Sequence, residues 1–394
     1  MPKIRRVAVV CNLTRPYDRR IIRGIAHYMH EVGTWSLYAE EDPLQKLPDL
    51  AYWDGDGLIV DFDDRKVATA LRGVDMPVVG IGGGYGWYDP ASNIPYLATD
   101  NVTISTMAAE HLLECGLRQF AFCGFPRTRV NGWSAERAEA FAASVAQRGC
   151  ACSMYTGTQA SARRWSDIQQ GLVRWLRTLA YPLGLMACND ARARHVLEAC
   201  RALRLRVPDD VALIGVDNDE IMCELARPPL SSIEQGTFQM GYEAAALLDR
   251  LMAGRRPRQR RFLIPPERLV ARQSTDVLAV DDPDVAVAVG FIREHACEGI
   301  ALADVLEQVS VSCSSLEKRF RKHLGRTIHS EIQRVQIERV KHLLDTTSLS
   351  IRQVMRRTGF NYVQYMTTLF RKTTGYTPAE YRARKINPVP RSRG

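Results

Sequence analysis

The sequence has no long apolar run and no cysteine or histidine spacing typical of a metal site. No stretch approaches the roughly 18 apolar residues that a membrane-spanning helix needs. The ten cysteines are scattered, without a CxxC pair or a Cys/His zinc motif, so we expect reduced thiols in a cytoplasmic protein and no bound metal. The first apolar segment, residues 7–11, is too short for a signal-peptide core and is interpreted as a buried strand.

Common signatures of catalysis and nucleotide binding are missing as well. No serine lies in a G-x-S-x-G motif. The glycine-rich stretch GIGGGYG, residues 80–86, has Tyr85 where a dinucleotide-binding loop needs its last glycine, and we interpret it as backbone lining a cleft. We therefore expect neither an enzyme nor a cofactor. The alternative is an enzyme that acts on sugars through a pair of aspartates such as Asp61 and Asp190.

The positive charge of the chain is concentrated in its last quarter. The formal net charge is +9, and residues 286–394 carry 19 Lys and Arg against 9 Asp and Glu. The preceding residues carry 34 basic and 35 acidic side chains, so the whole surplus belongs to this segment. Such asymmetry predicts a module that binds an anionic polymer, although a solvated basic face would give the same count.

Hydrophobic patterning divides the chain into an α/β body and a helical end. In residues 1–275 short apolar runs alternate with amphipathic helical segments, which predicts parallel sheets covered by helices in two lobes. Proline and charge then break this pattern, and we place a linker at 276–284. Residues 285–386 have only helical periodicity and predict an all-α domain, and residues 387–394 are interpreted as a tail.

One basic, glycine-terminated motif occurs twice in the helical domain. KRFRKHLGRT at 318–327 and TLFRKTTGYT at 368–377 share Phe-Arg-Lys, then glycine and threonine at the same spacing. Each copy follows a shorter helical segment, which predicts two helix-turn-helix units joined by a helix near 327–345. Short polar side chains beside Arg and Lys on an outward face suit the base edges and phosphates of DNA.

The two copies also predict which helix faces are buried. In the second unit we expect Asn361 to be the N-cap of the second helix. Its spacing of apolar residues predicts one buried face, made of Tyr362, Tyr365, Met366, Leu369 and Phe370. In the first unit Arg319 stands at the position of Leu369, so we expect that helix to be packed less deeply.

The helical domain resembles the AraC-type DNA-binding domain over residues 285–386, most specifically in RRTGFNYVQYMTTLFRKTTGYTPAEYR. In that family two helix-turn-helix units enter successive major grooves of double-stranded DNA. The resemblance implies that the following side chains read or grip operator DNA: Ser314, Ser315, Lys318, Arg321, Lys322, Asn361, Gln364, Thr368 and Arg371.

The body resembles the sugar-binding core of LacI-type regulators and periplasmic pentose-binding proteins over most of residues 97–254, notably in PPLSSIEQGTFQMGYEAAALLDRLMAG. The resemblance implies two periplasmic-binding-protein-like lobes that close on a sugar at the strand ends. Hydroxyls need charged acceptors and forked donors, and Arg137 matches the arginine that clamps sugar hydroxyls in the family. The candidates for sugar contact are Asn12, Tyr17, Asp18, Arg19, Asp61, Trp133, Arg137, Asp190, Arg192, Asp217 and Gln235. For Arg137, Asp190 and Asp217 a helix cap or an interlobe ion pair is the structural alternative.

The order of the two parts differs from that of LacI-type proteins, whose DNA-binding helices precede the sugar core. With PYDRRIIRGI and DGLIVDFDD, the arrangement resembles the bacterial regulators of xylose operons over essentially the whole chain. This implies a D-xylose-responsive transcriptional activator, a cytoplasmic homodimer that binds promoter DNA and contacts RNA polymerase. A regulator for another pentose, a protein that mainly represses, and a sugar-binding transport protein are the alternatives.

Overall fold

The computed structural model describes two compact units, residues 1–277 and 278–394. The described residues are 4–32, 35–39, 50–71, 73–84, 86–89, 91–128, 131–157, 165–255, 257–277, 282–347 and 349–386. Of the predicted linker, residues 278–281 lie outside the described residues, whereas Pro283 and Asp284 already belong to the first helix of the second unit. The predicted tail, 387–394, and Tyr85 also lie outside.

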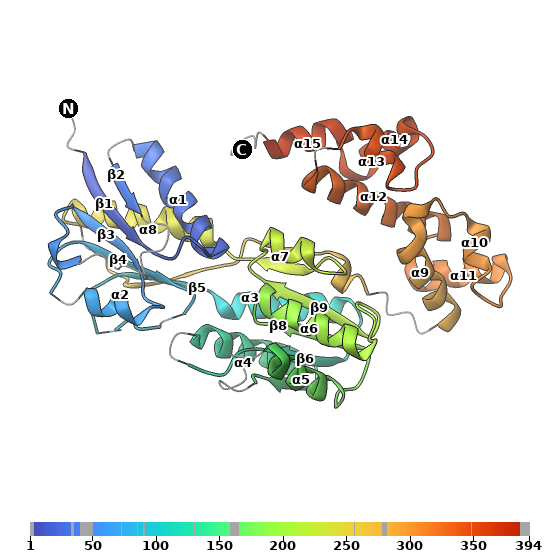
Figure 1. Cartoon of the computed structure of the whole chain (residues 1–394), viewed down its shortest axis with the longest axis horizontal. Coiled ribbons are helices and arrows are strands. Elements are labelled where there is room, and N and C mark those ends of the chain that lie inside the picture. Colours follow the sequence, from blue (N-terminus) through green and yellow to red (C-terminus); the bar gives the residue numbers. More distant parts are fainter. Residues whose placement is uncertain are drawn as a thin grey trace. The chain divides into compact units, whose positions relative to one another are not determined.

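Two six-stranded sheets form the first unit, in the orders β11-β5-β4-β3-β1-β2 and β12-β10-β9-β8-β6-β7 (Figure 1). The first sheet contains β1 (Arg5–Val10), β2 (Trp35–Ala39), β3 (Gly57–Asp61), β4 (Val78–Gly82), β5 (Tyr96–Thr99) and β11 (Arg261–Ile264). The second contains β6 (Gln119–Cys123), β7 (Cys152–Tyr155), β8 (Leu183–Ala187), β9 (Val211–Val216), β10 (Ser231–Glu234) and β12 (Arg268–Val270). Apart from the antiparallel β10–β12 pair, the described pairings are parallel.

Helices cover both faces of each sheet, as alternating strands and amphipathic segments predict. The first lobe has α1 (Pro16–Val32) and α8 (Thr237–Met252) on one face, and η1 (Leu50–Tyr52) and α2 (Arg65–Ala70) on the other. The second lobe has α3 (Asn101–Glu114) and α4 (Gly132–Ala146) on one face, and α5 (Trp165–Leu176), α6 (Asp190–Leu203) and α7 (Glu220–Leu225) on the other. The predicted fold of two α/β lobes with parallel sheets is confirmed.

Residues 254–284, which are rich in proline and charge, contain two strands that the sequence did not predict. β11 and β12 are edge strands, one in each sheet. Edge strands tolerate proline and arginine because one side of the backbone needs no ladder partner. These two strands form through pairing with distant segments, and their local composition does not predict them. A short 3-10 helix, η3 (Gln273–Thr275), follows β12.

The chain crosses between the lobes at three places in the described residues, and these segments lie side by side. The amide of Asp100 donates to the carbonyl of Ile264 (2.9 Å), and that of Glu267 donates to the carbonyl of Glu234 (2.8 Å). At Gly236 a Cβ would lie 2.2 Å from the carbonyl oxygen of Pro265, so only glycine permits this approach. The crossovers bring the ends of β5, β10 and β11 to one region.

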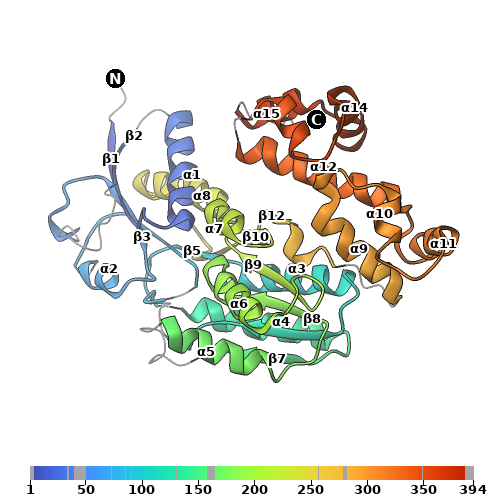
Figure 2. The ribbon, with the colours of Figure 1, turned by 45° about the vertical axis from the view of Figure 1, so that its right-hand side comes forward.

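The second unit is helical throughout its described residues, as predicted. It contains α9 (Pro283–His295), η4 (Ala296–Glu298), α10 (Leu302–Leu306), α11 (Cys313–Leu324), α12 (Ile328–Thr346), α13 (Ile351–Arg356), α14 (Val363–Thr374) and α15 (Pro378–Ile386). Two hydrophobic clusters form, one around Phe320 and one around Phe370. Helix α12 contributes to both and runs from one helix-turn-helix unit to the other (Figure 2). Among the described residues no helix is long and apolar enough to cross a membrane.

The repeated motif ends one helix and begins the next in each copy. Gly325 and Gly375 have φ of +65° and +80° at the C-caps of α11 and α14, a conformation that glycine adopts at little cost. Thr327 then accepts a hydrogen bond from the amide of Ser330 (3.1 Å) and caps α12. Thr377 accepts one from the amide of Glu380 (3.3 Å) at the start of α15. The repeat is therefore a helix-stop and helix-start signal around a buried phenylalanine.

Two details of the predicted α14 are wrong. Its N-cap is Tyr362 and not Asn361. Met366 and Phe370 are buried as predicted, but Tyr362 is 71% and Tyr365 is 47% exposed. Tyr362 has extended backbone angles before the first helical turn, so helical periodicity does not apply to it, and Tyr365 packs edge-on against Phe360.

The prediction of shallower packing for α11 is also wrong. Leu316 and Phe320 are fully buried, as Met366 and Phe370 are in α14. Arg319 instead reaches the start of α9 and forms an ion pair with Asp284 (2.8 Å). The substitution of a cation for leucine therefore adds a polar link without opening the core.

Candidate functional site

Arg137 is the centre of a buried polar cluster in the first unit. It projects from α4 and is 2% exposed. Its guanidinium donates to the side-chain oxygen of Asn101 (2.8 Å), the carbonyl of Cys188 (2.7 Å) and the side-chain oxygen of Gln235 (3.1 Å). It also lies over the ring of Trp133, 4.8 Å from the centroid. A guanidinium carries more N–H donors than these bonds use, so donors remain for a ligand.

Asp217 joins this cluster from the loop after β9. The amide nitrogen of Gln235 donates to its carboxylate, while the oxygen of Gln235 accepts from Arg137. Burial raises the pKa of Asp217 to about 6, although Arg137 opposes the shift. Asp217 has a φ of +111°, a conformation that is costly for a side chain with a Cβ and is concentrated at functional loops.

Two predicted aspartates of the first lobe are buried as well. Asp18 on α1 is 1% and Asp61 at the end of β3 is 5% exposed. Burial raises the pKa of Asp61 to about 6 and raises that of Asp18 well above its usual range, with Asp61 and Asp217 adding to the effect. One carboxylate oxygen of Asp18 has no hydrogen-bond partner within the described part of the chain. A buried acceptor of this kind is suited to a hydroxyl donor.

The other predicted residues of the first lobe bond within the protein. The hydroxyl of Tyr17 lies 3.0 Å from that of Thr99 at the first crossover. The side chain of Asn12 accepts from the amide of Thr14 (2.9 Å) and shapes its own turn. Arg19 is exposed and donates to the carbonyl oxygens of Leu13 and Thr14. Tyr17 therefore borders the cluster, whereas Arg19 braces the loop before α1.

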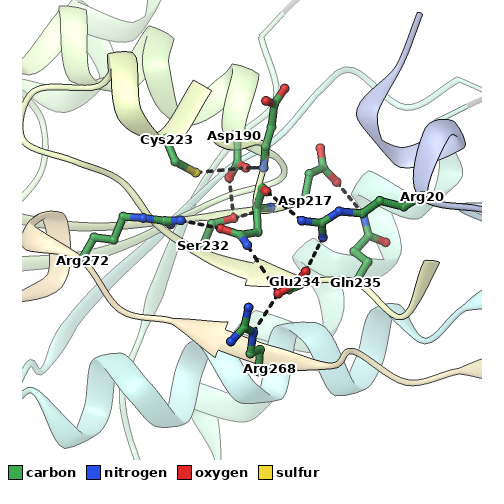
Figure 3. A network of polar contacts seen from close by, with 11 residues as sticks. Arg20, Asp190, Asp217, Cys223, Ser232, Glu234, Gln235, Arg268 and Arg272 are labelled. Carbon is green, nitrogen blue, oxygen red and sulfur yellow. Dashed lines mark hydrogen bonds and ion pairs between the residues drawn. The ribbon is translucent and has the colours of Figure 1, made fainter. Parts of the chain in front are cut away.

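Asp190 has protein partners on both carboxylate oxygens. One accepts from the hydroxyl of Ser232 (2.6 Å) and the other from the amide of Asp219 (2.9 Å), with the thiol of Cys223 at 3.5 Å (Figure 3). These bonds hold the loop that carries Asp217. A direct contact between Asp190 and a ligand stays a prediction.

Arg192, on the same helix as Asp190, is a buried cation. Its side chain is 6% exposed and its guanidinium lies 4.3 Å from the ring centroid of Phe125. Its Nε has no hydrogen-bond partner in the described ranges. Arg192 thus retains donor capacity that a ligand oxygen could satisfy.

An ion-pair network between the lobes was not predicted. Arg20 on α1 pairs with Glu234 at the end of β10 (2.6 Å), and Glu234 also pairs with Arg268 on β12 (2.8 Å). Arg20 further donates to the carbonyl of Asn218 (3.4 Å), whose side-chain oxygen accepts from Arg272 (2.7 Å). Figure 3 shows that this network adjoins the pair formed by Asp217 and Gln235.

Sequence reasoning also missed Asn101, which orients Arg137 from the first crossover. Asn101 is 3% exposed, and its amide nitrogen donates to the carbonyl of Gly83 (2.8 Å) and to Glu136 (2.8 Å). The only available signal was position. Asn101 begins α3, and Glu234 ends β10. Arg20 and Asn218 directly follow the predicted residues Arg19 and Asp217.

The glycine-rich stretch after β4 packs against this cluster. At Gly84 a Cβ would lie 3.2 Å from the backbone nitrogen of Trp133. The amide of Gly83 donates to the carboxylate of Asp63 (2.9 Å). These glycines therefore lie beside Trp133 and Asp63, and their interpretation as backbone lining a cleft stays a prediction.

The predicted DNA-contacting side chains lie on the outward faces of α11 and α14, except Asn361, which precedes the N-cap of α14. Ser315, near the cap of α11, is half-buried. The others are exposed: Ser314, Lys318, Arg321, Lys322, Asn361, Gln364, Thr368 and Arg371. Each face opposes a buried phenylalanine, Phe320 or Phe370. Both helices thus present hydroxyls or amides together with cations, the groups that reach base edges and phosphates.

Comparison with known proteins identifies the family. Residues 6–102 match the XylR N-terminal domain, 109–275 the periplasmic binding protein-like domain and 305–384 a helix-turn-helix domain. The xylose operon regulatory protein of Escherichia coli (strain K12) is 39% identical over 381 residues, 96% of this chain and 97% of its own. The chain belongs to the xylose operon regulatory protein family. The family member of Haemophilus influenzae is 37% identical over 378 residues, 96% of this chain and 98% of its own.

Two solved structures resemble this chain, one over nearly its whole length and one over its first unit. The structure of a xylose-binding transcription activator superposes with a TM-score of 0.79 at 38% identity, covering 97% of this chain and 98% of that one. A LacI family regulator from Enterococcus faecium with bound ribose matches at 21% identity with a TM-score of 0.55, covering 69% of this chain. The second similarity is one of fold alone. The relatives in this family are transcriptional regulators.

Proposed function

We propose that this protein is a D-xylose-responsive transcriptional regulator that binds the sugar in its first unit and DNA through its second. Membership of the xylose operon regulatory family supports the assignment. The observation that carries the sugar site is the buried oxygen of Asp18 without a partner, together with the buried cluster of Arg137, Gln235 and Asp217. Acceptors and forked donors of this kind suit a ligand with a hydroxyl on nearly every carbon.

The ligand contacts are assigned to the side chains that retain bonding capacity. Arg137 and Arg192 donate, and Asp18, Asp61 and Asp217 accept. Trp133 offers an aromatic face, while Tyr17 and Gln235 border the site. Asn12, Arg19 and Asp190 contribute indirectly, because their hydrogen bonds fix the loops beside the site.

Regulation requires that the sugar binds one arrangement of the lobes better than another. The three crossovers permit lobe movement, and the ion pair of Arg20 with Glu234 links the lobes. A change in the first unit would then alter how the DNA-binding units of two protomers meet their sites. Ile221 and Leu225, on one face of α7, are 62% and 63% exposed, which supports self-association as a homodimer. We assign the protein to the cytoplasm and to activation through RNA polymerase.

Calorimetry with D-xylose, D-ribose, L-arabinose and D-glucose tests the effector. We expect the tightest binding for D-xylose, because a hexose adds a hydroxymethyl group to an enclosed site. Arg137→Met should weaken xylose binding by about 100-fold, because it removes the charged donor. Arg127→Met is the matched control, since that arginine is exposed on the same lobe.

The same measurements separate the alternatives. Tighter binding of ribose or arabinose would make the protein a regulator for another pentose. No binding of any of these sugars, or equal loss in both arginine variants, would contradict the site. A promoter-reporter assay with and without xylose distinguishes activation from repression.

A further inference from the structure

A glycine turn of the second helix-turn-helix unit lies against backbone atoms of the segment that leads into the first. Gly359 lies between α13 and α14 with a φ of +73°. A Cβ at this position would lie 2.7 Å from the carbonyl oxygen of Ala296 and 2.8 Å from the amide nitrogen of Gly299. Ala296 lies in η4 and packs in the hydrophobic cluster around Phe320, and Gly299 is the C-cap of η4. Both residues directly precede α10, the first helix of the first helix-turn-helix unit. Glycine at 359 therefore allows the turn between α13 and α14 to lie directly against η4 and its C-cap.

One side chain of the joining helix is bonded to both sides of this contact. Gln336 lies near the middle of α12 and is 5% exposed. Its amide nitrogen donates to the carbonyl of Ala296 (3.0 Å) and to that of Gly359 (3.3 Å). Loss of this amide would leave two carbonyl oxygens at a buried junction without their donor, which is costly. The glycine turn and Gln336 together tie both units to one point on α12.

This junction determines how α11 and α14 are placed relative to each other. Each helix packs into its own hydrophobic cluster, around Phe320 and Phe370 respectively. The clusters share α12, but α10 and α11 on one side and α13 and α14 on the other could shift against it. The hydrogen bonds from Gln336 to Ala296 and to Gly359 oppose such a shift.

We propose that Gln336 is a positioning residue that sets the base-pair spacing at which one monomer reads two major grooves. The proposal rests on the proposed DNA-binding function and specifies how that function is exercised. One inserted base pair moves the second groove by about 3.4 Å and rotates it by roughly 35° around the DNA axis. With the Gln336 hydrogen bonds in place, α14 cannot move relative to α11 to follow this displacement. Without these bonds it can.

The test uses the full-length protein with D-xylose and DNA selected from a random library. Footprinting locates the two groove contacts of one monomer, and base pairs are then inserted or removed singly between them. For the wild type we expect each single change to weaken binding by about tenfold or more. Gln336→Met has a similar length without hydrogen-bond donors, and we expect its loss per base pair to be about threefold or less.

Two further variants distinguish a specific effect of Gln336 from a general effect of substitution. Gln308→Met is the matched control, because Gln308 is exposed and its amide bonds within its own turn to Asp304, so its spacing profile should equal the wild type. Gln336→Glu places a carboxylate against the two carbonyl oxygens and should broaden the profile as the methionine variant does. DNA with only one groove site reports whether each unit still binds, and binding there should be unchanged.

An unchanged spacing profile in both Gln336 variants, with single-groove binding intact, would overturn the proposal. Loss of single-groove binding in both variants would also overturn it, since Gln336 would then support the units themselves. Failure of the wild type to select or bind any DNA would instead contradict the proposed function.

Discussion

At the scale of single residues, the first unit is unusual in burying carboxylates that lack full compensation. Burial is the largest cause of the raised pKa of Asp18, Asp61, Asp63 and Asp217. Such groups cost folding free energy when they are ionised without partners. Asp217 lies beside Arg137, and the charges of Asp61 and Asp217 help to raise the pKa of Asp18. We propose that ligand binding, and not stability, accounts for this grouping.

The pKa of Asp217 leads to a prediction about stability without sugar. Its folded-state value, about 6, lies above the ordinary value of 3.8, so the folded protein retains a proton that the unfolded chain releases between these values. The contribution of Asp217 to the free energy of unfolding therefore falls as pH rises from about 4 to about 6 and remains low above that. Asp217→Asn should raise this free energy on the order of 3 kcal/mol at pH 7.5 and little at pH 4.

Urea denaturation of the sugar-free protein at both pH values measures this difference. Asp75→Asn is the control, because Asp75 is exposed in the loop before β4, and its effect should be small at both values. A destabilised Asp217→Asn protein at pH 7.5 would indicate that attraction to Arg137 outweighs burial.

At the scale of elements, three glycines of the DNA-binding unit have the same backbone conformation but different surroundings. Gly325, Gly359 and Gly375 all have positive φ. Nothing lies within 4 Å of a Cβ added at Gly325 or Gly375, so these glycines serve as helix caps. Gly359 instead carries the contact between the units. A common residue type therefore performs two physically distinct tasks.

This contrast predicts unequal costs of substitution by alanine. Gly375→Ala should lower the free energy of unfolding by about 1 kcal/mol, the strain of a left-handed backbone. Gly359→Ala should cost about 3 kcal/mol or more, because its methyl group would also overlap the atoms of Ala296 and Gly299. Denaturation of a fragment spanning residues 282–394 tests this, and equal costs would show that the junction yields easily.

At the scale of the whole molecule, the regulator combines a two-lobed sensor with a helical reader. The lobes are joined by the crossovers and by the ion pair of Arg20 with Glu234, whose side chains are 23% and 10% exposed. A partly buried pair of this kind favours the arrangement in which it forms. We propose that D-xylose binds this same arrangement, so that the ion pair and the sugar act in the same direction.

Arg20→Met should weaken D-xylose binding about fivefold, equivalent to roughly 1 kcal/mol. Arg5→Met is the matched control, because it breaks an ion pair with Asp249 inside the first lobe (2.7 Å). Calorimetry on both variants measures the effect. Equal weakening, or none, would indicate that the Arg20 pair does not favour the sugar-binding arrangement.

The features that the sequence determined by itself are local. Alternating apolar runs specified the parallel lobes, and the repeated Phe-Arg-Lys…Gly…Thr specified two helix-turn-helix units, because periodicity, capping and backbone preferences act between near neighbours. The resemblance in these segments also indicated the family. Strand ends and crossovers selected Asp217 and Gln235 as candidates, since the carboxyl ends of parallel strands converge, and the family resemblance added Arg137.

Only the tertiary structure decided which partners these side chains have. Asp190 and Asp18 are both buried aspartates, yet Asp190 is bonded on both oxygens by the second lobe, whereas one oxygen of Asp18 has no partner among the described residues. Asn101 and Gln336 could not be found from pattern, because their bonds join segments 36 and 40 residues apart. Burial, pairing and the edge strands β11 and β12 depend on such distant contacts, which no local preference encodes.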